Sequence, residues 1–356
     1  MNPMPPLAGT LTPRQTDLIA RFHEKKPVAL ARAISMVEDE RSGFQELLHE
    51  LLKAGPQTAR LGFTGPPGAG KSSLVAASAA RYRARDETVG VVAVDPTSPY
   101  SGGALLGDRI RMNDLATDPG IFIRSMASRG SLGGLATTTK EVLDLMDVFR
   151  FDRLLIETVG VGQTELEITA AADTVVVVLV PESGDAIQAM KAGLMEIADI
   201  FVVNKADRPG ADRLVKEIRQ AMHLRAGSAL KDVPAHHGVD LGRVMKKERS
   251  EAPSVDEGDW SVPVLATTAQ SGEGVDELLD AVERHRSWLA SSGQLEERRR
   301  ARAKGRVQDV VNRELRRITW RSPDTVELLE GGVERIRTSD ATPYSVAKDI
   351  IEGLLR

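Results

Sequence analysis

Apolar residues recur at helical spacing in the first part of the chain. Within Pro27–Glu40, five apolar residues fall on one side of a helix: Leu30, Ala31, Ala33, Ile34 and Val37. Residues three and four positions apart share a helix face, so this spacing predicts an amphipathic helix. The same argument predicts helices over Asp17–Glu24 and Phe44–Leu52, the last ending before Gly55-Pro56. Residues 1–55 are therefore predicted to form a helical extension.

From residue 59 to about 288, short apolar runs alternate with longer helical patterns. The predicted strands are Arg60–Thr64, Thr88–Val94, Ile121–Arg124, Arg153–Glu157, Thr174–Val180, Ile200–Asn204 and Val262–Ala266. Apolar strands separated by helices are typical of βαβ units, which build a mainly parallel sheet with helices on both faces. The fold class is therefore α/β, and ligands are expected at the carboxyl ends of the strands.

The remaining segments depart from this alternation. Residues 221–260 hold prolines, the pair His236-His237 and clustered charges, so we predict an inserted excursion there. Residues 294–318 predict a helix with apolar residues along one side, and 324–356 predict a small mixed piece ending in an amphipathic helix. The predicted parts are thus 1–55, the α/β domain 56–290, and an arm 291–356 whose apolar helix face suits a partner subunit.

A glycine-rich loop lies between the first predicted strand and the following helix. It has the pattern G-x-x-x-x-G-K-[ST] and comprises Gly65, Pro66, Pro67, Gly68, Ala69, Gly70, Lys71, Ser72 and Ser73. In this pattern the backbone N–H groups surround the α- and β-phosphates of a nucleotide. The lysine reaches the β- and γ-phosphates, and the hydroxyl at Ser72 can bind Mg²⁺. The loop predicts a P-loop NTPase.

A second motif indicates which base is bound. The strand Ile200–Asn204 leads into the N-K-x-D pattern, with Asn204, Lys205 and Asp207. The carboxylate of Asp207 can accept two hydrogen bonds from guanine, whereas adenine offers no such pair of donors on that edge. The residues after the last strand, Thr268, Ala269 and Gln270, fit a further loop that contacts guanine through backbone N–H groups. The bound nucleotide is therefore predicted to be GTP or GDP.

Acidic residues follow other predicted strands. Asp95 ends the second strand, Asp108 lies in the loop beyond it, and Glu157 ends the strand that precedes Gly160. Carboxylates here can hold Mg²⁺ or its water, or orient the attacking water, and the Gly160 N–H can meet the γ-phosphate. Asp95 as a plain turn residue and Asp108 as a helix cap remain alternatives. Gln163 lies three positions beyond Gly160, so no water-positioning role is assigned to it.

Composition narrows the function classes. The 356 residues are 41% hydrophobic, 28% charged and 4% aromatic, with a net charge of −4. Few aromatics and this charge disfavour nucleic acid and anionic membrane as partners. The chain has no cysteine, which excludes thiolate metal sites and fits a reducing compartment. We find no pattern of a signal peptide or a membrane span, so a cytoplasmic location is expected.

The chain resembles the MeaB/ArgK-type G proteins, the family of the methylmalonic aciduria type A protein. The stretches that carry the resemblance are Ala29–Glu38, Gly65–Ser73, Val94–Pro99, Arg124–Gly134, Glu157–Glu165, Gly184–Asp185 and Asn204–Asp207. It covers roughly residues 28–290 and, more loosely, the C-terminal arm.

The resemblance implies a homodimeric, Mg²⁺-dependent GTPase that acts as a chaperone of an adenosylcobalamin-dependent acyl-CoA mutase, usually methylmalonyl-CoA mutase. Such proteins gate cofactor loading and protect or reactivate the mutase. The resemblance also implies that Lys191, in the loop after the fifth strand, is a catalytic lysine, and that Asp95, Asp108 and Glu157 surround Mg²⁺ and the water. A GTPase for metal insertion and a P-loop metabolite kinase are the alternatives, but the lack of cysteine and the guanine motif disfavour them.

Overall fold

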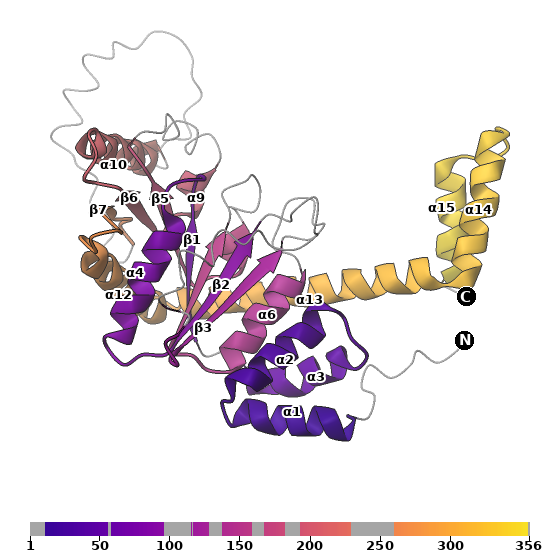
Figure 1. Cartoon of the computed structure of the whole chain (residues 1–356). Helices are drawn as coiled ribbons and strands as arrows, with labels where there is room; N and C mark the ends of the chain where they lie inside the picture. Colours follow the sequence, from indigo (N-terminus) through magenta and orange to yellow (C-terminus); the bar gives the residue numbers. More distant parts are fainter. Residues whose placement is uncertain are drawn as a thin grey trace, which may run out of the picture. The chain divides into compact units, whose positions relative to one another are not determined.

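The computed structural model shows two compact units, one formed by Thr10–Arg299 and one that includes Arg300–Arg356 (Figure 1). The structure describes residues 11–55, 58–95, 115, 117–127, 137–158, 167–181, 193–228 and 260–354. For Asp95, Ala127, Thr137 and residues 224–228 it describes the backbone alone. Each unit is described by itself below.

The first unit contains a seven-stranded sheet and the helices that cover it. The strands are β1 (Ala59–Thr64), β2 (Val89–Asp95), β3 (Ile121–Ala127), β4 (Arg153–Thr158), β5 (Thr174–Leu179), β6 (Ile200–Asn204) and β7 (Val264–Thr267). The helices are α1 (Pro13–His23), α2 (Pro27–Glu38), α3 (Phe44–Leu51), α4 (Lys71–Arg83), α6 (Thr137–Val148), α9 (Leu194–Ile197), α10 (Ala211–Ser228), α12 (Val275–Ser291) and the start of α13 (Gln294–Arg321), with 3-10 turns η1 (Leu52–Ala54) and η2 (Ile168–Ala170).

All neighbouring strands are parallel, in the order β3-β2-β4-β1-β5-β6-β7. From β1 the chain runs through β2 to the edge strand β3. It then reverses, returns through β4 to lie beside β1, and continues on the other side of β1 through β5, β6 and β7. A crevice forms at such a reversal, outside the carboxyl ends of the strands. The phosphate loop starts at the carboxyl end of β1 and therefore lies at this point of the sheet. The predicted α/β class with a parallel sheet is confirmed.

Side chains alternate between two cores, one on each face of the sheet. On β5, Val175 and Val177 belong to the core formed with α6, α10 and the N-terminal helices. Val176 and Val178 belong to the opposite core, formed with α4 and α12. All of β5 is buried, and its β-branched residues suit a strand that packs on both faces. This burial holds the loops at the strand ends in place.

The predicted strands are all present, with shifts of one to three residues at their ends. Ile200–Asn204 was predicted with the bounds of β6, whereas β3 continues three residues beyond the predicted end, to Ala127. The stretch predicted as an excursion, 221–260, begins within a helix, because α10 continues through Ser228. Residues 229–259, including His236-His237, lie outside the described residues.

The N-terminal helices have clear start signals. Thr12 accepts a hydrogen bond from the Gln15 backbone N–H, and the Gln15 side chain accepts one from the Thr12 N–H, which is a capping box. Proline occupies the first position of both α1 and α2, where its missing N–H costs nothing. These signals fix where α1 and α2 begin, and the two helices belong to the predicted helical extension.

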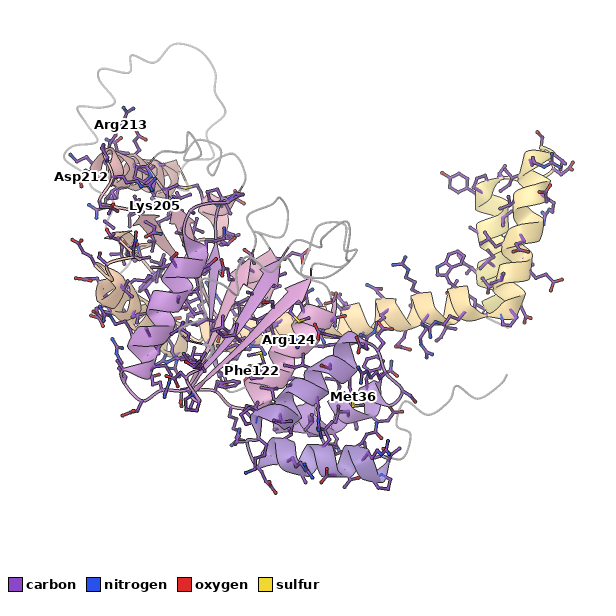
Figure 2. The ribbon with its side chains drawn as sticks, viewed as in Figure 1. Met36, Phe122, Arg124, Lys205, Asp212 and Arg213 are labelled. Carbon is purple, nitrogen blue, oxygen red and sulfur yellow. The ribbon has the colours of Figure 1, made fainter. Side chains whose placement is uncertain are left out.

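Specific contacts join the helical extension to β3 and to the residues that follow α6. Phe22 of α1 packs edge-on against Phe149, with ring centroids 5.1 Å apart. Arg124 of β3 forms an ion pair with Glu38 at the end of α2 (Figure 2). The inner face of α2 is buried, with Ala33, Ile34 and Val37 at 0% exposure. The extension is thus part of the same unit as the sheet.

The regular elements described in the second unit are all helices. It contains the rest of α13, α14 (Pro323–Arg337) and α15 (Pro343–Leu354). Helices α14 and α15 approach closely where Gly332 faces Val346, because a Cβ at Gly332 would lie 2.3 Å from the valine side chain. The predicted C-terminal amphipathic helix is present as α15, but the prediction of a mixed piece over 324–356 was wrong for the described part, where α14 replaces it.

Candidate nucleotide-binding site

The phosphate loop joins the end of β1 to the start of α4. Gly65, Gly68 and Gly70 have φ of +134°, +76° and +84°. Residues other than glycine rarely adopt these backbone angles. A Cβ at Gly65 would lie 2.1 Å from the Val178 carbonyl oxygen of β5, and one at Gly70 would lie 2.3 Å from the Asn204 amide. The backbone angles of the turn therefore favour glycine at all three positions, and the nearby atoms leave no room for a side chain at Gly65 and Gly70.

Lys71 and Ser72 form the first turn of α4, directly after the loop. The Lys71 ammonium donates to the carbonyl oxygens of Gly65 (2.8 Å) and Pro66 (3.0 Å), so it lies over the loop. The Ser72 hydroxyl donates to Oε1 of Glu157 at 2.6 Å. Ser72 and Glu157 are each 5% exposed. The loop, the lysine and an acid from β4 thus meet in one place.

The Ser72–Glu157 pair suits Mg²⁺. The hydroxyl and the carboxylate supply oxygen donors, which this cation prefers, and Mg²⁺ usually keeps several waters and takes one or two protein carboxylates. Glu157 lies beside Phe63 of β1 and Ala93 of β2 in the sheet register, at the carboxyl end of β4. Among the described residues no cluster of three or more His, Cys, Asp and Glu side chains could hold a metal by itself.

Other predicted residues of the phosphate and metal region are described only in part. Asp95 is the last residue of β2 and pairs with Ala127 of β3, which places its backbone at the carboxyl edge of the sheet. Its side chain, and all of Asp108, Gly160, Gln163 and Lys191, lie outside the described residues. Their predicted roles therefore remain predictions.

Asn204 connects three loops at the carboxyl edge. Its Nδ2 donates to the Ala69 carbonyl oxygen of the phosphate loop at 2.9 Å. Its Oδ1 accepts from the Ala269 backbone N–H at 3.1 Å and from the Thr267 hydroxyl at 3.2 Å. The side chain is 2% exposed, so its bonds are protected from water. The loops that follow β1, β6 and β7 are thereby held in one arrangement.

The residues that follow Asn204 are oriented for a ligand. Lys205 has φ +57°, and Figure 2 shows it at the same end of the unit as α10. Asp207 is exposed, and its carboxylate makes no hydrogen bond or ion pair with any described residue. It can therefore accept two donors from a purine base. The roles of Lys205 and Asp207 in binding guanine remain predictions.

The third loop follows β7 as a tight turn. Ser271 and Gly272 donate backbone N–H bonds to the Thr268 carbonyl, and the Thr268 N–H donates to the Glu273 carbonyl at 2.9 Å. A Cβ at Gly274 would lie 2.2 Å from the Ala266 carbonyl oxygen, so glycine is required there. The turn fixes Ala269 against Asn204 and leaves Gln270 exposed beside it.

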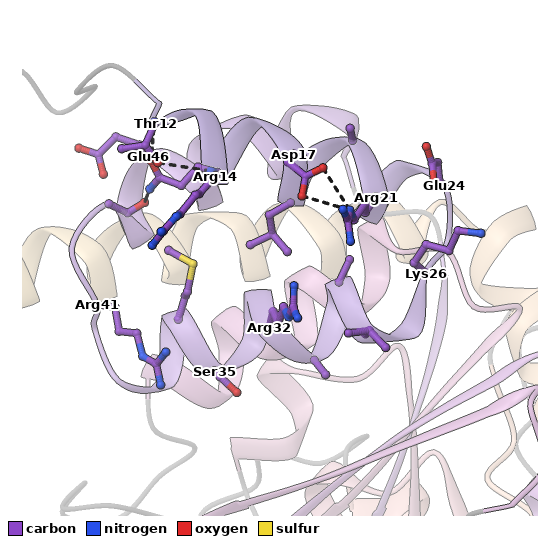
Figure 3. Close-up of a pocket in the computed structure, with 18 of the residues that line it drawn as sticks. Thr12, Arg14, Asp17, Arg21, Glu24, Lys26, Arg32, Ser35, Arg41 and Glu46 are labelled. Carbon is purple, nitrogen blue, oxygen red and sulfur yellow. Dashed lines mark hydrogen bonds and ion pairs between the residues drawn. The ribbon is translucent and has the colours of Figure 1, made fainter.

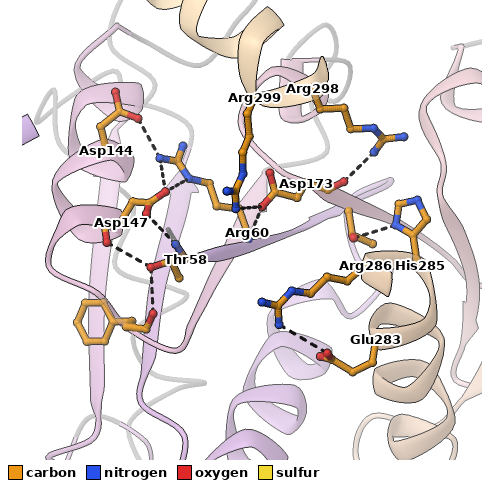
Figure 4. A network of polar contacts seen from close by, with 12 residues as sticks. Thr58, Arg60, Asp144, Asp147, Asp173, Glu283, His285, Arg286, Arg298 and Arg299 are labelled. Carbon is orange, nitrogen blue, oxygen red and sulfur yellow. Dashed lines mark hydrogen bonds and ion pairs between the residues drawn. The ribbon is translucent and has the colours of Figure 1, made fainter. Parts of the chain in front are cut away.

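Sequence reasoning missed a polar network at the opposite, amino edge of the sheet (Figure 4). The Arg298 guanidinium of α13 donates two bonds of 2.8 Å to the Asp199 carboxylate and one of 2.7 Å to the Asp173 carbonyl oxygen. Nδ1 of His285 shares a 2.9 Å hydrogen bond with the Thr174 hydroxyl. Burial lowers the pKa of His285 to about 4, although the Asp199 carboxylate opposes this shift.

A buried arginine extends this network to β1. Arg60 donates to the Asp147 carboxylate at 2.8 Å and to the Asp144 carboxylate at 3.0 Å, and it is 3% exposed. The Arg60 backbone N–H also donates to the Asp173 carboxylate. The only hint in the sequence is an aspartate directly before both β5 and β6. The network joins the base of α13 to the strands whose other ends carry the nucleotide loops.

A parallel sheet with this phosphate loop and an Asn204-linked guanine loop defines a P-loop GTPase. The family model "Methylmalonyl Co-A mutase-associated GTPase MeaB" matches residues 30–324, and the chain belongs to this family. None of the described helices has the length and apolar character needed to cross a membrane.

Individual relatives agree with the family. A Pyrococcus abyssi relative is 40% identical over 339 residues, covering 95% of this chain and 96% of the relative. The GTPase ArgK of Escherichia coli is 33% identical over 285 residues (79% and 78%). The mitochondrial methylmalonic aciduria type A homolog of Mus musculus is 35% identical over 290 residues (77% and 64%). A solved structure described as "LAO/AO transport system kinase" has the same fold, with a TM-score of 0.63, 24% identity, and coverage of 98% and 100%.

Proposed function

We propose that this GTPase is a Mg²⁺-dependent chaperone of an adenosylcobalamin-dependent acyl-CoA mutase, with methylmalonyl-CoA mutase as the first candidate. In this proposal GTP binding and hydrolysis gate cofactor loading and protect or reactivate the mutase. The observation that supports the client is the family match over residues 30–324, whose description names this mutase. The name of the mouse relative, which refers to methylmalonic aciduria, supports the same client.

For the nucleotide, we assign the phosphates to Gly65–Ser73 and the guanine to Asn204, Lys205, Asp207 and Thr268–Gln270. The support is the arrangement around Asn204, which joins the phosphate loop to both base loops through the Ala69 carbonyl and the Ala269 N–H. Lys71 lies over the phosphate loop, from where its flexible stem can turn toward the β- and γ-phosphates.

For the metal, we assign Ser72 as the ligand from the loop and Glu157 as the acid that accepts from metal-bound water. When bound, the cation would supply positive charge that offsets the negative charge of the phosphates. The 2.6 Å contact between the two side chains supports this pairing. Asp95 and Asp108 are proposed to complete the acids around Mg²⁺ and the attacking water, Gly160 to meet the γ-phosphate, and Lys191 to act as the catalytic lysine.

We further propose that the protein is a homodimer formed through its C-terminal arm. An apolar row on α13 is exposed at helical spacing: Val307 (63%), Val311 (48%), Leu315 (57%) and Ile318 (42%). Apolar side chains are also exposed on α14, where Val333 is 52% exposed, and on α15, where Ile351 is 56% exposed. Apolar surface of this kind is typical of protein–protein interfaces. A second copy of the arm carries the same apolar row, so the two rows would cover each other in a dimer.

The experiment that tests the chaperone is a GTPase assay with and without purified methylmalonyl-CoA mutase. We expect the mutase to raise the hydrolysis rate or change the nucleotide affinity, and we expect GTP to be strongly preferred over ATP. Lys71→Ala is the matched negative control, because it removes the charge aimed at the phosphates. Equal binding of ATP and GTP, or no response to the mutase, would contradict the proposal.

A further inference from the structure

A groove of about 1860 Å³ runs along the N-terminal helices, away from the nucleotide loops (Figure 3). It is lined by α1, α2 and the turn that leads into α3. The opposite side of α2 is buried against α6, so the groove lies on the outer side of the helical extension. None of the residues that line it belongs to the phosphate loop or to the loops after β6 and β7.

The groove combines an apolar floor with charged sides. Leu18 of α1 and Ala29 of α2 contribute buried apolar surface, and Met36 of α2 is half-buried beside them. Val28, at the start of α2, is 63% exposed. Methionine adapts its shape to different partners, which makes it common at surfaces that bind helices. An apolar floor of this kind is suited to the apolar face of an amphipathic helix.

The charges along the groove are mostly positive and partly unpaired. Arg21 and Arg41 form ion pairs with the nearby Asp17 and Asp39. In contrast, Arg14, Lys26 and Arg32 line the groove, are exposed and make no ion pair with any described residue.

Two of the unpaired charges come from the two helices that flank the groove. Figure 3 shows Arg14 and Arg32 pointing from α1 and α2 into the space between the two helices. An occupant that places carboxylates between them would gain charge complementarity on both sides.

From this arrangement we infer that the groove between α1 and α2 is a docking site for an acidic amphipathic helix of the client mutase. The inference rests on the proposed function for the identity of the partner. Apolar side chains of the helix lie on Leu18, Ala29 and Met36, and its acidic side chains lie between Arg14 and Arg32. The contact tethers the client to the helical extension independently of the nucleotide loops.

A helix fits these features better than other anionic partners. A membrane surface is too broad to enter a groove between two helices, and it would bind the exposed rim only. Nucleic acid needs a denser row of phosphate contacts than three unpaired cations can provide, and Glu24 on the same surface would oppose it. The apolar floor would contribute nothing to a phosphate backbone.

The test compares charge reversal in the groove with the same change elsewhere. Arg14→Glu/Arg32→Glu reverses the two facing charges, which are exposed, so folding should be retained and is checked by thermal melting. Lys216→Glu/Arg284→Glu is the matched control, because both residues are exposed on α10 and α12 and make no ion pair with described residues. GTPase rates are measured while methylmalonyl-CoA mutase is titrated at two salt concentrations.

We expect the groove variant to need about tenfold or more mutase for half-maximal response, because each reversal turns an attraction into a repulsion. Its basal rate and its maximal response should equal those of wild type, and added salt should narrow the difference. The control variant should titrate as wild type does.

Each other outcome decides against the inference. Equal titration of wild type and the groove variant overturns the docking site and leaves the proposed function intact. A wild-type protein that does not respond to the mutase overturns the proposed function and, with it, this client at the groove. Cosedimentation with phosphatidylserine vesicles that only the groove variant loses would assign the surface to a membrane instead.

Discussion

The Ser72 hydroxyl donates a 2.6 Å hydrogen bond to the Glu157 carboxylate, across 85 residues of sequence. Ser72 lies in the first turn of α4, after the phosphate loop, and Glu157 is the residue before the last of β4, which pairs with β1 in the sheet. Both side chains are almost fully buried, so this oxygen pair forms a defined place for a hard cation beside the phosphates.

We expect Glu157→Gln to raise the Mg²⁺ concentration needed for GTP binding by about 10- to 100-fold, because acids next to metal ligands have effects of this size on metal affinity. The measurement is GTP binding during a Mg²⁺ titration, with fluorescent nucleotide. Glu196→Gln, on the exposed side of α9, makes the same chemical change away from the site and is the control. An unchanged Mg²⁺ requirement in Glu157→Gln would remove this residue from the metal site.

Asn204→Ala is expected to lower both stability and nucleotide affinity. It deletes three hydrogen bonds and leaves the buried Ala69 carbonyl and Ala269 N–H without their partner. The expected loss is about 1–3 kcal/mol in the free energy of unfolding, measured by urea denaturation. Thr267→Val deletes only one of the three bonds and should lose about 1 kcal/mol or less. Equal losses in the two variants would contradict the role of Asn204 as a connector.

Asp207→Asn should change the base preference without changing stability. An amide offers one donor and one acceptor where the carboxylate offers two acceptors, so it matches xanthine better than guanine. Competition between GTP and XTP for the free protein measures the preference. The control is Asp212→Asn, which alters an exposed aspartate at the start of α10. If Asp207→Asn kept the preference for GTP, the guanine assignment would be wrong.

The lowered pKa of His285 predicts that the folded protein loses stability at mildly acidic pH. Its pKa is lowered by burial from 6.5 to about 4, so between these values the unfolded chain binds a proton that the folded chain does not. The free energy of unfolding therefore falls as the pH is lowered through this window, by up to about 3 kcal/mol, since one pKa unit is about 1.4 kcal/mol. Denaturation across pH 4–7 measures the slope.

Two variants isolate the contribution of His285. His285→Gln cannot take up the proton and should show a flatter profile, even if its stability at pH 7 is lower. His49→Gln replaces an exposed histidine on α3 and should follow wild type. A His285→Gln profile as steep as that of wild type would assign the pH dependence to other groups.

The exposed apolar row on α13 predicts a dimer that charged substitutions in this row would dissociate. Val311→Asp/Leu315→Asp places two charges on the exposed apolar row of α13, so we expect the dimer to dissociate to monomers in light scattering after gel filtration. Lys216→Asp/Arg284→Asp places two carboxylates at exposed positions on α10 and α12, outside the arm, and is the control. A monomeric wild type, or a dimer that survives the first variant, would contradict the proposed interface.

The sequence predicted the local elements well because their signals are local. Strands such as Ile200–Asn204 are short, continuous apolar runs, and the helices carry apolar residues three and four positions apart. The mixed piece predicted over 324–356 was wrong because α14 contains Gly331 and Gly332, and glycine disfavours the interior of a helix. Only the packing of Gly332 against Val346 shows why glycine is tolerated in that helix.

By itself, the sequence determined the α/β class, the phosphate loop and the guanine motif, because the residues of each motif are contiguous in the chain. The tertiary structure alone decided the strand order, the contact of Ser72 with Glu157, and the bonds of Asn204 to Ala69 across 135 residues. It also brought Arg298 to Asp199 and created the groove between α1 and α2. These pairs depend on which strands and helices become neighbours, and that choice is made by the burial of the two cores and not by any local pattern.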